Sequence, residues 1–482
     1  MQVARHSLDY VIGFLSFAVF LALAIKISKY LRVIVYLFIV IFFINILTSV
    51  SSFIIYNTVF DPQMAYNILA TDIEEASSFS NTLILPIVIS LFFISIFSIS
   101  IERLSNELSF NKTTIIFSII WIFLPLVWLY KEKYDLSVYT KQHPDRLGVR
   151  IIKSKTIFYN YYEFLRGYEQ LQDVRNILKT PFNSAHLKSL NLSKSIDKII
   201  IIVGESARRQ NMSLYGYDRL TTPNQEAEKE NMLLYTNAVS PAPFTHQAVP
   251  LSLSSIKFDD YAAHRYQDMN DNVVNVADKH GYFPYWITHR ISPEERFLSN
   301  KAKEIKITGG YYDENLLPSF KTFLQNEKKQ LIILHFWGSH ADAKNNYPAS
   351  KKVFKENNHL DSYDNSIAYT DFVLGKVFMV LRNYNAAVIY YSDHGQEYNY
   401  GKFFHAQTKN ANKVPLYIWY GNKVPLELRK TGLVSDKIST RVVYSKALEL
   451  MGLVNTAVES VSPPLYLENG KKVQFKNLKD VN

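Results

Sequence analysis

Three groups of polar residues in this sequence each follow an apolar run, and their side chains are of types that bind metal ions. The groups are Gly204-Glu205-Ser206, Gly338-Ser339-His340 and Asp393-His394-Gly395. Carboxylates and imidazoles are good ligands for Zn²⁺ or Mn²⁺, and a neighbouring glycine lets the backbone turn sharply and approach a ligand closely. The pattern predicts that Glu205, Asp393 and His394 hold a divalent metal ion.

The apolar runs before these groups have the length and composition of buried strands. They are KIIIIVGES (198–206), QLIILHFWGSH (330–340) and AAVIYYSDHG (386–395), with helical patterns between them such as residues 361–383. Continuous apolar runs suit strands that are covered on both faces. We therefore predict a doubly wound α/β domain with a mostly parallel sheet between helices. In such sheets a site forms outside the carboxyl ends of the strands, where all three polar groups lie.

Each motif alone has an ordinary structural explanation. An isolated Gly-Glu-Ser is typical of a turn, and an isolated His340 is typical of a hydrogen-bonded loop histidine; the joint pattern in strand order is much more specific. The residues by themselves leave the nucleophile open, because Ser206, Ser240 and Thr245 all carry hydroxyl groups. A helix that begins near Thr245 would direct free N–H groups at a phosphate.

The first 130 residues contain four apolar stretches, at about 8–26, 31–56, 83–101 and 114–130. Each has roughly the 17–25 residues that a helix needs to cross a bilayer. A signal peptide followed by buried core helices is the alternative, but a signal peptide explains only the first stretch. Lys and Arg lie in the first and third connections and are absent from residues 57–82, so the positive-inside bias places everything after Tyr130 outside. The same count also places the N-terminus outside.

The chain has 53 Lys and Arg against 43 Asp and Glu, a formal net charge of +10. The excess lies after residue 130, because the earlier part carries six basic and seven acidic residues. A basic domain beside a membrane favours anionic lipid headgroups, although a simply solvated surface explains the charge nearly as well. A location outside the membrane argues against nucleic acid as a partner. The absence of cysteine excludes disulfides and thiolate metal sites.

Three domains are expected: a transmembrane domain (1–130), an interfacial connector (131–195) and a catalytic domain (196–482). The connector contains FYNYYEFLRGYEQLQDVRNIL, which begins at Phe158 and has aromatic and aliphatic residues at helical spacing. Tyrosine favours membrane–water interfaces, so this helix either lies along the bilayer or packs on the soluble domain.

Beyond these patterns, the sequence resembles the phosphoethanolamine transferases of Gram-negative inner membranes, in the alkaline phosphatase/sulfatase superfamily. The resemblance covers nearly the whole chain. Its matching segments are FDPQMAYNILATDIEEA (60–76), IIVGESARRQNMSLYGYDRLTTPN (201–224), SPAPFTHQAVPLSLSS (240–255), LHFWGSHADAKNNYP (334–348) and YYSDHGQEY with His405 following it (390–405).

The resemblance implies a role for each site residue. Glu205, Asp393 and His394 would bind zinc, or Mn²⁺ in its place. Thr245 would be both the nucleophile and a fourth ligand, and His340 and His405 would face the phosphoryl group or its leaving oxygen. Zinc lowers the pKa of bound water from about 15.7 to about 7, and it would acidify a bound threonine similarly.

The reaction that the resemblance implies begins with phosphatidylethanolamine. A phospho-threonine intermediate forms, diacylglycerol is released, and the phosphoethanolamine passes to lipopolysaccharide, on a core sugar or on lipid A. The protein would be a multi-pass protein of the bacterial inner membrane with its catalytic domain in the periplasm. Alternatives are a glycerol-phosphate transferase or phosphodiesterase of the same superfamily, or a non-catalytic membrane protein with a degenerate hydrolase domain.

The sequence also departs from the family pattern. Many relatives carry cysteines near the nucleophile, whereas this chain has none, and Lys413 stands before Val414-Pro415 where some relatives have histidine. The lysine argues against a second zinc site. The family usually has five spans, against the four counted here. The cysteine-free pattern is more similar to branches that act on core sugars than to those that act on lipid A.

Overall fold

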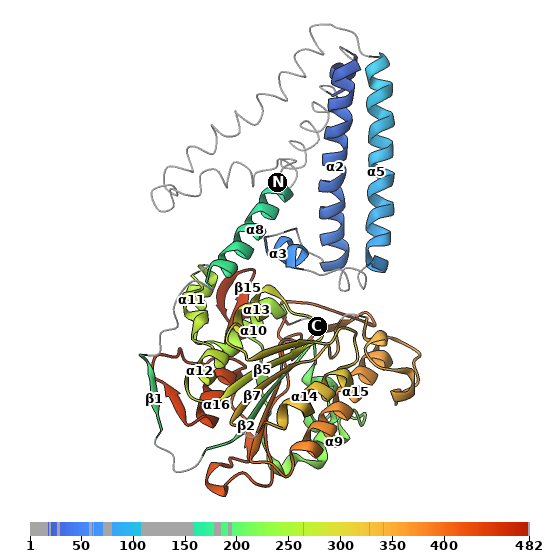
Figure 1. The fold of residues 1–482 in the computed structure, drawn as a ribbon. Coiled ribbons are helices and arrows are strands. Elements are labelled where there is room, and N and C mark those ends of the chain that lie inside the picture. Colours follow the sequence, from blue (N-terminus) through green and yellow to red (C-terminus); the bar gives the residue numbers. More distant parts are fainter. Residues whose placement is uncertain are drawn as a thin grey trace. The chain divides into compact units, whose positions relative to one another are not determined.

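The fold is taken from a computed structural model of the full chain. It describes residues 18, 21–26, 29–56, 60, 62–70, 80–107, 159–177, 185–190, 195–263, 265–326, 328–340 and 342–480. The chain divides into two compact units, residues 1–169 and 170–482, and each is treated by itself. Figure 1 shows both units.

The first unit contains α2 (Lys29–Tyr56), α3 (Pro62–Ala70), α5 (Ser80–Glu107) and the start of α8 (Tyr159–Ile177). Within α2 and α5, the segments Arg32–Ser52 and Leu83–Glu107 are long and apolar enough to cross a membrane. Large apolar side chains on both helices are exposed, including Leu37 (59%) and Phe92 (62%). Such surfaces are unfavourable in water and suit a lipid environment.

Of the four expected spans, two have candidate membrane-spanning helices among the described residues. The predicted stretches 31–56 and 83–101 correspond to α2 and α5, although α5 continues to Glu107 through a charged last turn. Most of stretch 8–26 and all of stretch 114–130 lie outside the described residues.

Helix α8 begins where the sequence predicts a helix, and its first turn is attached to α2. Asn160 Nδ2 donates to the Asn45 carbonyl at 3.0 Å and to Ser49 Oγ at 2.8 Å. The Tyr161 hydroxyl donates to the Ile41 carbonyl at 2.5 Å. Neither sequence-based alternative for this helix included a contact with α2.

The second unit is built on one mixed sheet of eight strands, in the order β12-β3-β11-β8-β2-β7-β5-β6. Their bounds are β2 (Lys198–Gly204), β3 (Met232–Tyr235), β5 (Phe283–Thr288), β6 (Glu304–Ile307), β7 (Gln330–His335), β8 (Ala386–Ser392), β11 (Leu416–Tyr420) and β12 (Gly432–Val434). The three predicted apolar runs are β2, β7 and β8, which are adjacent and parallel. The expected mostly parallel sheet is therefore found from β8 to β6, whereas β11 runs antiparallel to both of its neighbours.

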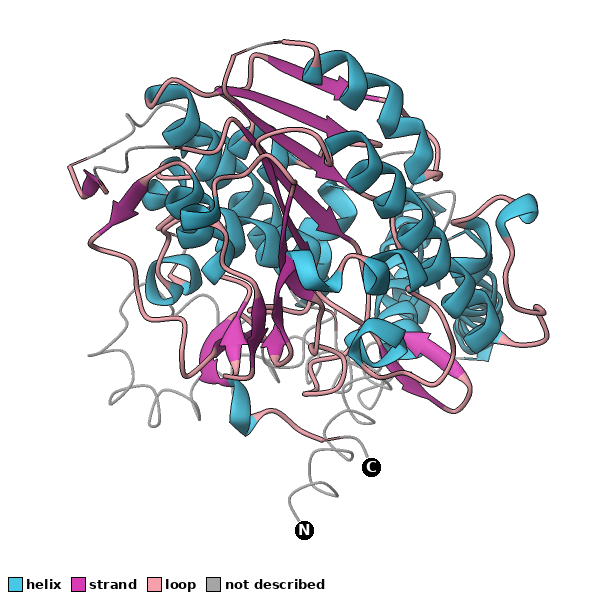
Figure 2. Ribbon diagram, turned by 90° about the horizontal axis from the view of Figure 1, so that it is seen from below, coloured by secondary structure: helices cyan, strands magenta, loops and turns pink. Residues whose placement is uncertain are grey.

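Helices cover both faces of this sheet, as Figures 1 and 2 show. Ile199, Ile201 and Val203 of β2 belong to one buried cluster, which also includes residues of α10 (Thr245–Leu253), α12 (Val273–Lys279) and α16 (Val442–Leu450). Ile200 and Ile202 belong to a second cluster, with α14 (Leu317–Leu324) and α15 (His359–Leu381). This alternation follows from the two-residue period of a strand. Each fully buried aliphatic side chain contributes about 1.5–3 kcal/mol, so both faces hold β2 at the centre.

The remaining elements are short and lie around the sheet. The helices are α9 (Pro223–Ala227), α11 (Phe258–Ala262) and α13 (Pro293–Leu298). The paired strands are β1 (Leu187–Ser189) with β14 (Leu453–Asn455), β4 (Ala238–Val239) with β13 (Ile438–Ser439), β9 (Glu397–Asn399) with β10 (Lys402–Phe404), and β15 (Leu465–Glu468) with β16 (Lys471–Gln474). The β9–β10 hairpin leads the chain from Asp393-His394 to His405.

Candidate metal centre

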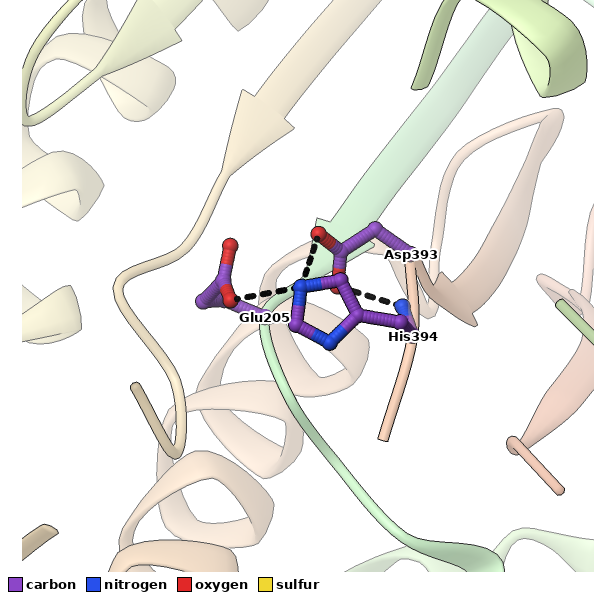
Figure 3. Close-up of side chains that lie close together, drawn as sticks. All are labelled: Glu205, Asp393 and His394. Atoms are coloured by element: carbon purple, nitrogen blue, oxygen red, sulfur yellow. Dashed lines mark hydrogen bonds and ion pairs between the residues drawn. The ribbon is translucent and has the colours of Figure 1, made fainter. Parts of the chain in front are cut away.

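The ends of β2 and β8 place the predicted metal ligands side by side. Gly204 and Ser392 are paired across these parallel strands. Glu205 is the residue after Gly204, and Asp393 is the residue after Ser392. The Asp393 N–H donates to the Gly204 carbonyl at 2.9 Å, which extends the pairing by one residue. The carboxylates therefore emerge at the same edge of the sheet, as Figure 3 shows.

Three ligand atoms converge at this edge. His394 Nε2 lies 3.4 Å from Glu205 Oε1 and 3.4 Å from Asp393 Oδ2, and all three residues are buried. Asp393 Oδ1 accepts hydrogen bonds from the N–H groups of Ser206 (3.1 Å) and His394 (2.7 Å). Asp393 Oδ2 has no hydrogen-bond partner among the described residues. A buried carboxylate oxygen without a partner is costly and fits a metal ligand.

The spacing also fits zinc. Ligand atoms about 2.0–2.1 Å from a tetrahedral zinc ion lie roughly 3.3 Å from one another, close to the 3.4 Å from His394 Nε2 to each carboxylate. Among the residues that the structure describes, Glu205, Asp393 and His394 form the group found with metal-ligand geometry. Lys413 Nζ, at the position that argues against a second zinc site, donates to Asn410 Oδ1 at 2.9 Å.

The two carboxyl groups have opposite pKa shifts. Burial and the charge of Glu205 raise the pKa of Asp393 to about 7. Burial alone would raise the pKa of Glu205 too, but the positive charges of His394, His340 and His335 outweigh it and lower that pKa. Burial would lower the pKa of His394, yet the charges of Asp393 and Glu205 raise it. The metal-free centre therefore holds protons that a metal ion must displace.

Zinc binding is expected to strengthen as the pH rises from about 6 to about 8, because Asp393 and His394 must lose protons to bind the ion. The ordinary pKa of an aspartate is 3.8, and that of folded Asp393 is about 7. Between these values the folded state binds a proton that the unfolded state lacks, so the metal-free protein loses stability as the pH rises toward 7. Competition with a chromophoric chelator at several pH values measures the affinity. An affinity independent of pH would contradict this assignment of the protons.

Thr245 lies beside the three ligands, at the first position of α10. Its hydroxyl donates to Glu205 Oε2 at 2.9 Å, and Thr245 Oγ1 also lies 3.4 Å from His394 Nε2. The first N–H groups of a helix have no partner within the helix and are suited to bind an anion. The hydroxyl and the helix start thus lie together at the metal centre.

The two other candidate nucleophiles, the hydroxyl groups of Ser206 and Ser240, are buried and already hydrogen-bonded. Ser206 Oγ donates to Glu205 Oε1 at 2.7 Å, and Ser240 Oγ bonds the carbonyl groups of Ala242 (2.7 Å) and Asp393 (2.5 Å). Both serines are completely buried, whereas Thr245 is partly exposed. Access and geometry therefore favour Thr245 over Ser206 and Ser240 as a nucleophile.

Two further histidines lie near the ligands. The ring of His405 is 4.5 Å from that of His394, between centroids, and stacks on Phe244 at 5.9 Å. Burial and the charge of His394 lower the pKa of His405 to about 3, so its imidazole is neutral near pH 7. His340 is buried against Trp337, with ring centroids 4.8 Å apart, and its charge lowers the pKa of Glu205. Both histidines therefore belong to the surroundings of the metal centre.

Two residues near the candidate ligands, His335 and Glu295, were not predicted from the sequence to belong to the site. His335, the last residue of β7, shares a 2.5 Å hydrogen bond with Glu295. Burial opposes the charge of His335, but Glu295 and the nearby carboxylates raise its pKa to about 9. The resulting positive charge helps to lower the pKa of Glu205 and offsets part of the rise in the pKa of Asp393. The position of His335 at the end of an apolar run could have indicated a role at this site. Its partner Glu295 gave no such signal, because it lies 40 residues away in the sequence.

The backbone is also tightly constrained at Ser206 and Gly338. Ser206 has a φ of +58°, a conformation that costs a residue with a side chain about 1–3 kcal/mol. Gly338 has a φ of +55°, and a Cβ there would lie 2.7 Å from the Glu205 carbonyl oxygen. Asp313 holds this loop by accepting from the N–H groups of Trp337 (2.6 Å) and Gly338 (3.1 Å). The glycine in the second motif thus serves close packing against Glu205.

Comparison with known proteins identifies the family. The model described as Sulfatase matches residues 197–453, more than half of the chain. YhbX of Escherichia coli (strain K12) is 32% identical over 392 residues, which cover 77% of this chain and 70% of that protein. The phosphoethanolamine transferase EptC of the same strain is 24% identical over 442 residues, or 78% of this chain and 72% of that protein.

Solved structures share the fold. The integral membrane protein lipooligosaccharide phosphoethanolamine transferase A (EptA) from Neisseria meningitidis superposes with a TM-score of 0.64 at 18% identity and covers 93% of this chain and 96% of its own. The C-terminal periplasmic domain of EcEptC from Escherichia coli, solved in complex with Zn, has a TM-score of 0.52 at 21% identity and covers 62% of this chain and 97% of its own. The chain belongs to the sulfatase family, and its relatives include proteins named phosphoethanolamine transferases.

Proposed function

We propose that the protein transfers phosphoethanolamine from phosphatidylethanolamine to a lipopolysaccharide acceptor, through a phosphorylated Thr245. The observation that carries this proposal is the position of the Thr245 hydroxyl, 2.9 Å from Glu205 Oε2 and 3.4 Å from His394 Nε2. The names of the relatives support the transferred group, and the zinc in the EcEptC structure supports the metal. In a degenerate, non-catalytic domain we would not expect a hydroxyl group to be retained beside a complete set of candidate metal ligands.

Glu205, Asp393 and His394 would hold the zinc ion, with Thr245 as the fourth ligand. When bound, zinc acidifies the threonine hydroxyl and offsets the negative charge of the phosphodiester oxygens. Manganese accepts the same ligand types. Burial of the carboxylates restricts water around them, which strengthens their interaction with a cation.

The residues of the chain then carry out two displacements at phosphorus. In the first, Thr245 Oγ1 loses its proton and forms a bond to phosphorus, the bond to the diacylglycerol oxygen breaks, and that oxygen takes up a proton. In the second, an acceptor hydroxyl, as it loses its proton, or an acceptor phosphate oxygen forms a bond to the same phosphorus. The bond from phosphorus to Thr245 Oγ1 breaks, and Oγ1 takes up a proton. Splitting the transfer into two steps avoids bringing both lipids to the site at once.

His340 and His405 would act on the oxygens that change charge. A neutral His405 keeps one N–H group, and the low pKa caused by its burial fixes that state over the physiological range. Such a group can donate a hydrogen bond to a phosphoryl oxygen but is a weak acid. We therefore propose His405 as a phosphoryl contact and His340 as the group closer to the leaving oxygen.

The membrane parts of the proposal explain how two lipid substrates reach one site. We propose a transmembrane domain within residues 1–130, a connector at 131–195 and a periplasmic catalytic domain from residue 196, in a multi-pass protein of the inner membrane. The exposed apolar surfaces of α2 and α5 support the anchor, and the full-length fold of EptA supports the arrangement along the chain.

Mass spectrometry of lipopolysaccharide from cells with and without this protein tests the proposed function. We expect an added mass of one phosphoethanolamine only in cells that contain the active protein, with fragment ions that locate it on lipid A or on a core sugar. Cells that produce the Thr245→Ala variant at equal abundance are the matched control. An added glycerol phosphate, or identical lipopolysaccharide in all three strains, would contradict the proposed transfer.

A further inference from the structure

Arg208 is a buried cation beside the metal centre. It follows Glu205 by three residues and is 9% exposed. Its aliphatic stem packs against the residue after His394, because a Cβ on Gly395 would lie 3.2 Å from Arg208 Cγ. The guanidinium lies over the ring of Phe403 in β10, 5.6 Å from its centroid. The stem of Arg208 thus lies against the loop that carries the other two candidate ligands, and its charge lies at the β9–β10 hairpin that follows that loop.

The guanidinium of Arg208 has no hydrogen-bond or ion-pair partner among the residues that the structure describes, and its Nε is completely buried. The neighbouring arginines differ in this respect. Arg209 donates to the Thr236 carbonyl, and Arg219 pairs with Asp361 at 2.9 Å and Asp364 at 2.6 Å. A buried charge without compensation costs several kcal/mol, so it persists where a ligand supplies the opposite charge.

Arg208 has two further basic residues near it, Arg209 and Lys413. Burial, the charge of Arg209 and, more weakly, the charge of Arg208 itself lower the pKa of Lys413, while Asp480 acts in the opposite direction. The N–H of Arg208 donates to the Tyr363 hydroxyl at 2.9 Å, which fixes the backbone from which the side chain extends. An anion that enters here meets the preorganised guanidinium of Arg208, with the ammonium group of Lys413 nearby.

We propose that Arg208 binds a phosphate oxyanion of a substrate next to the metal centre. A planar guanidinium binds two oxygens of a phosphate in a fixed geometry, which a lysine cannot reproduce. Two sources supply this chemistry: the phosphodiester of the donor lipid, or a phosphate group on the acceptor. The inference rests on the proposed function for its substrates, whereas the anion site itself is testable without turnover.

The first test measures phosphate binding by thermal unfolding of the zinc-loaded full-length protein. Inorganic phosphate is expected to stabilise the wild-type protein, and Arg208→Gln should raise the apparent dissociation constant roughly tenfold or more. Arg208→Lys should give an intermediate value. Arg209→Gln is the matched control, because Arg209 already has a carbonyl partner, and it should bind phosphate like the wild-type protein. Equal phosphate affinity in Arg208→Gln and the wild-type protein would overturn the proposal.

The second test identifies the source of the phosphate. Diacylglycerol release from phosphatidylethanolamine without acceptor measures donor cleavage, and the KM for acceptor measures the second step. If the donor phosphate is bound, Arg208→Gln slows diacylglycerol release; if the acceptor phosphate is bound, release is unchanged and the KM for a phosphorylated acceptor rises. Unchanged kinetics in both steps would refute a substrate role for Arg208. Absence of diacylglycerol release by the wild-type protein would instead contradict the proposed function and leave the phosphate-binding result standing.

Discussion

Thr245→Ala is expected to abolish transfer, with a loss of at least about 10³-fold, as is typical when a covalent nucleophile is removed. The hydroxyl that donates to Glu205 Oε2 disappears. The two other candidate hydroxyl groups, on Ser206 and Ser240, are buried and already hydrogen-bonded. Because Thr245 is partly exposed at the start of α10, the substitution leaves no large cavity in the core. Diacylglycerol release from phosphatidylethanolamine measures the first step directly.

Thr245→Ser is the matched control, since it keeps a hydroxyl on the same backbone and loses only a methyl group. We expect it to retain measurable transfer. Both variants should keep a zinc ion held by Glu205, Asp393 and His394, and both should keep wild-type thermal stability. Full activity in the alanine variant would refute the assignment of Thr245 as the nucleophile. Loss of activity together with loss of zinc would assign Thr245 to metal retention instead.

Asp393→Asn is expected to weaken zinc binding by about 10²–10⁴-fold, since removing one partner of a buried pair of charges costs about 3–5 kcal/mol. Transfer should fall with zinc occupancy. The metal-free variant should nevertheless be at least as stable as the metal-free wild-type protein at about pH 8. Burial and the negative charge of Glu205 disfavour a charged Asp393, and the amide removes that charge. Isothermal titration with zinc and chemical denaturation of both metal-free proteins check the two parts.

Asp364→Asn provides the contrasting control. Asp364 is also completely buried, but it accepts from Asn211, Tyr217 and Arg219 away from the metal centre. This variant should lose stability and keep its zinc affinity, the reverse of the result for Asp393→Asn. Equal zinc affinity in Asp393→Asn and the wild-type protein would remove Asp393 from the ligand set.

The convergence of Glu205, Asp393 and His394 was predictable because its determinants are local. Each candidate ligand, and also His340, follows an apolar run that is long enough for a strand and too uniformly apolar for an edge. The sequence therefore places β2, β7 and β8 inside the sheet. The polar residue at the end of each run then falls at the edge where the strands end. The pairing of Gly204 with Ser392, which aligns Glu205 and Asp393, follows from this arrangement.

Other features depend on contacts between distant residues and carry little local signal. The run LYIWY of β11 has the same apolar pattern whether it pairs in parallel or antiparallel fashion, so the mixed sheet was not predicted. The His335–Glu295 pair joins the end of a strand to the first turn of α13, and neither residue is part of a recognisable motif. In the first 130 residues, hydropathy predicts four spans and the described residues contain two candidates.

The most direct test of this account is to search for a phosphorylated Thr245. The wild-type protein, loaded with zinc and incubated with phosphatidylethanolamine without acceptor, is digested and its peptides are analysed by tandem mass spectrometry. We predict a phosphoethanolamine group on the peptide that contains Thr245, at that residue, and its disappearance when lipopolysaccharide is added. A protein that transfers the group while Thr245 stays unmodified, or that carries the group on another residue, would contradict the mechanism.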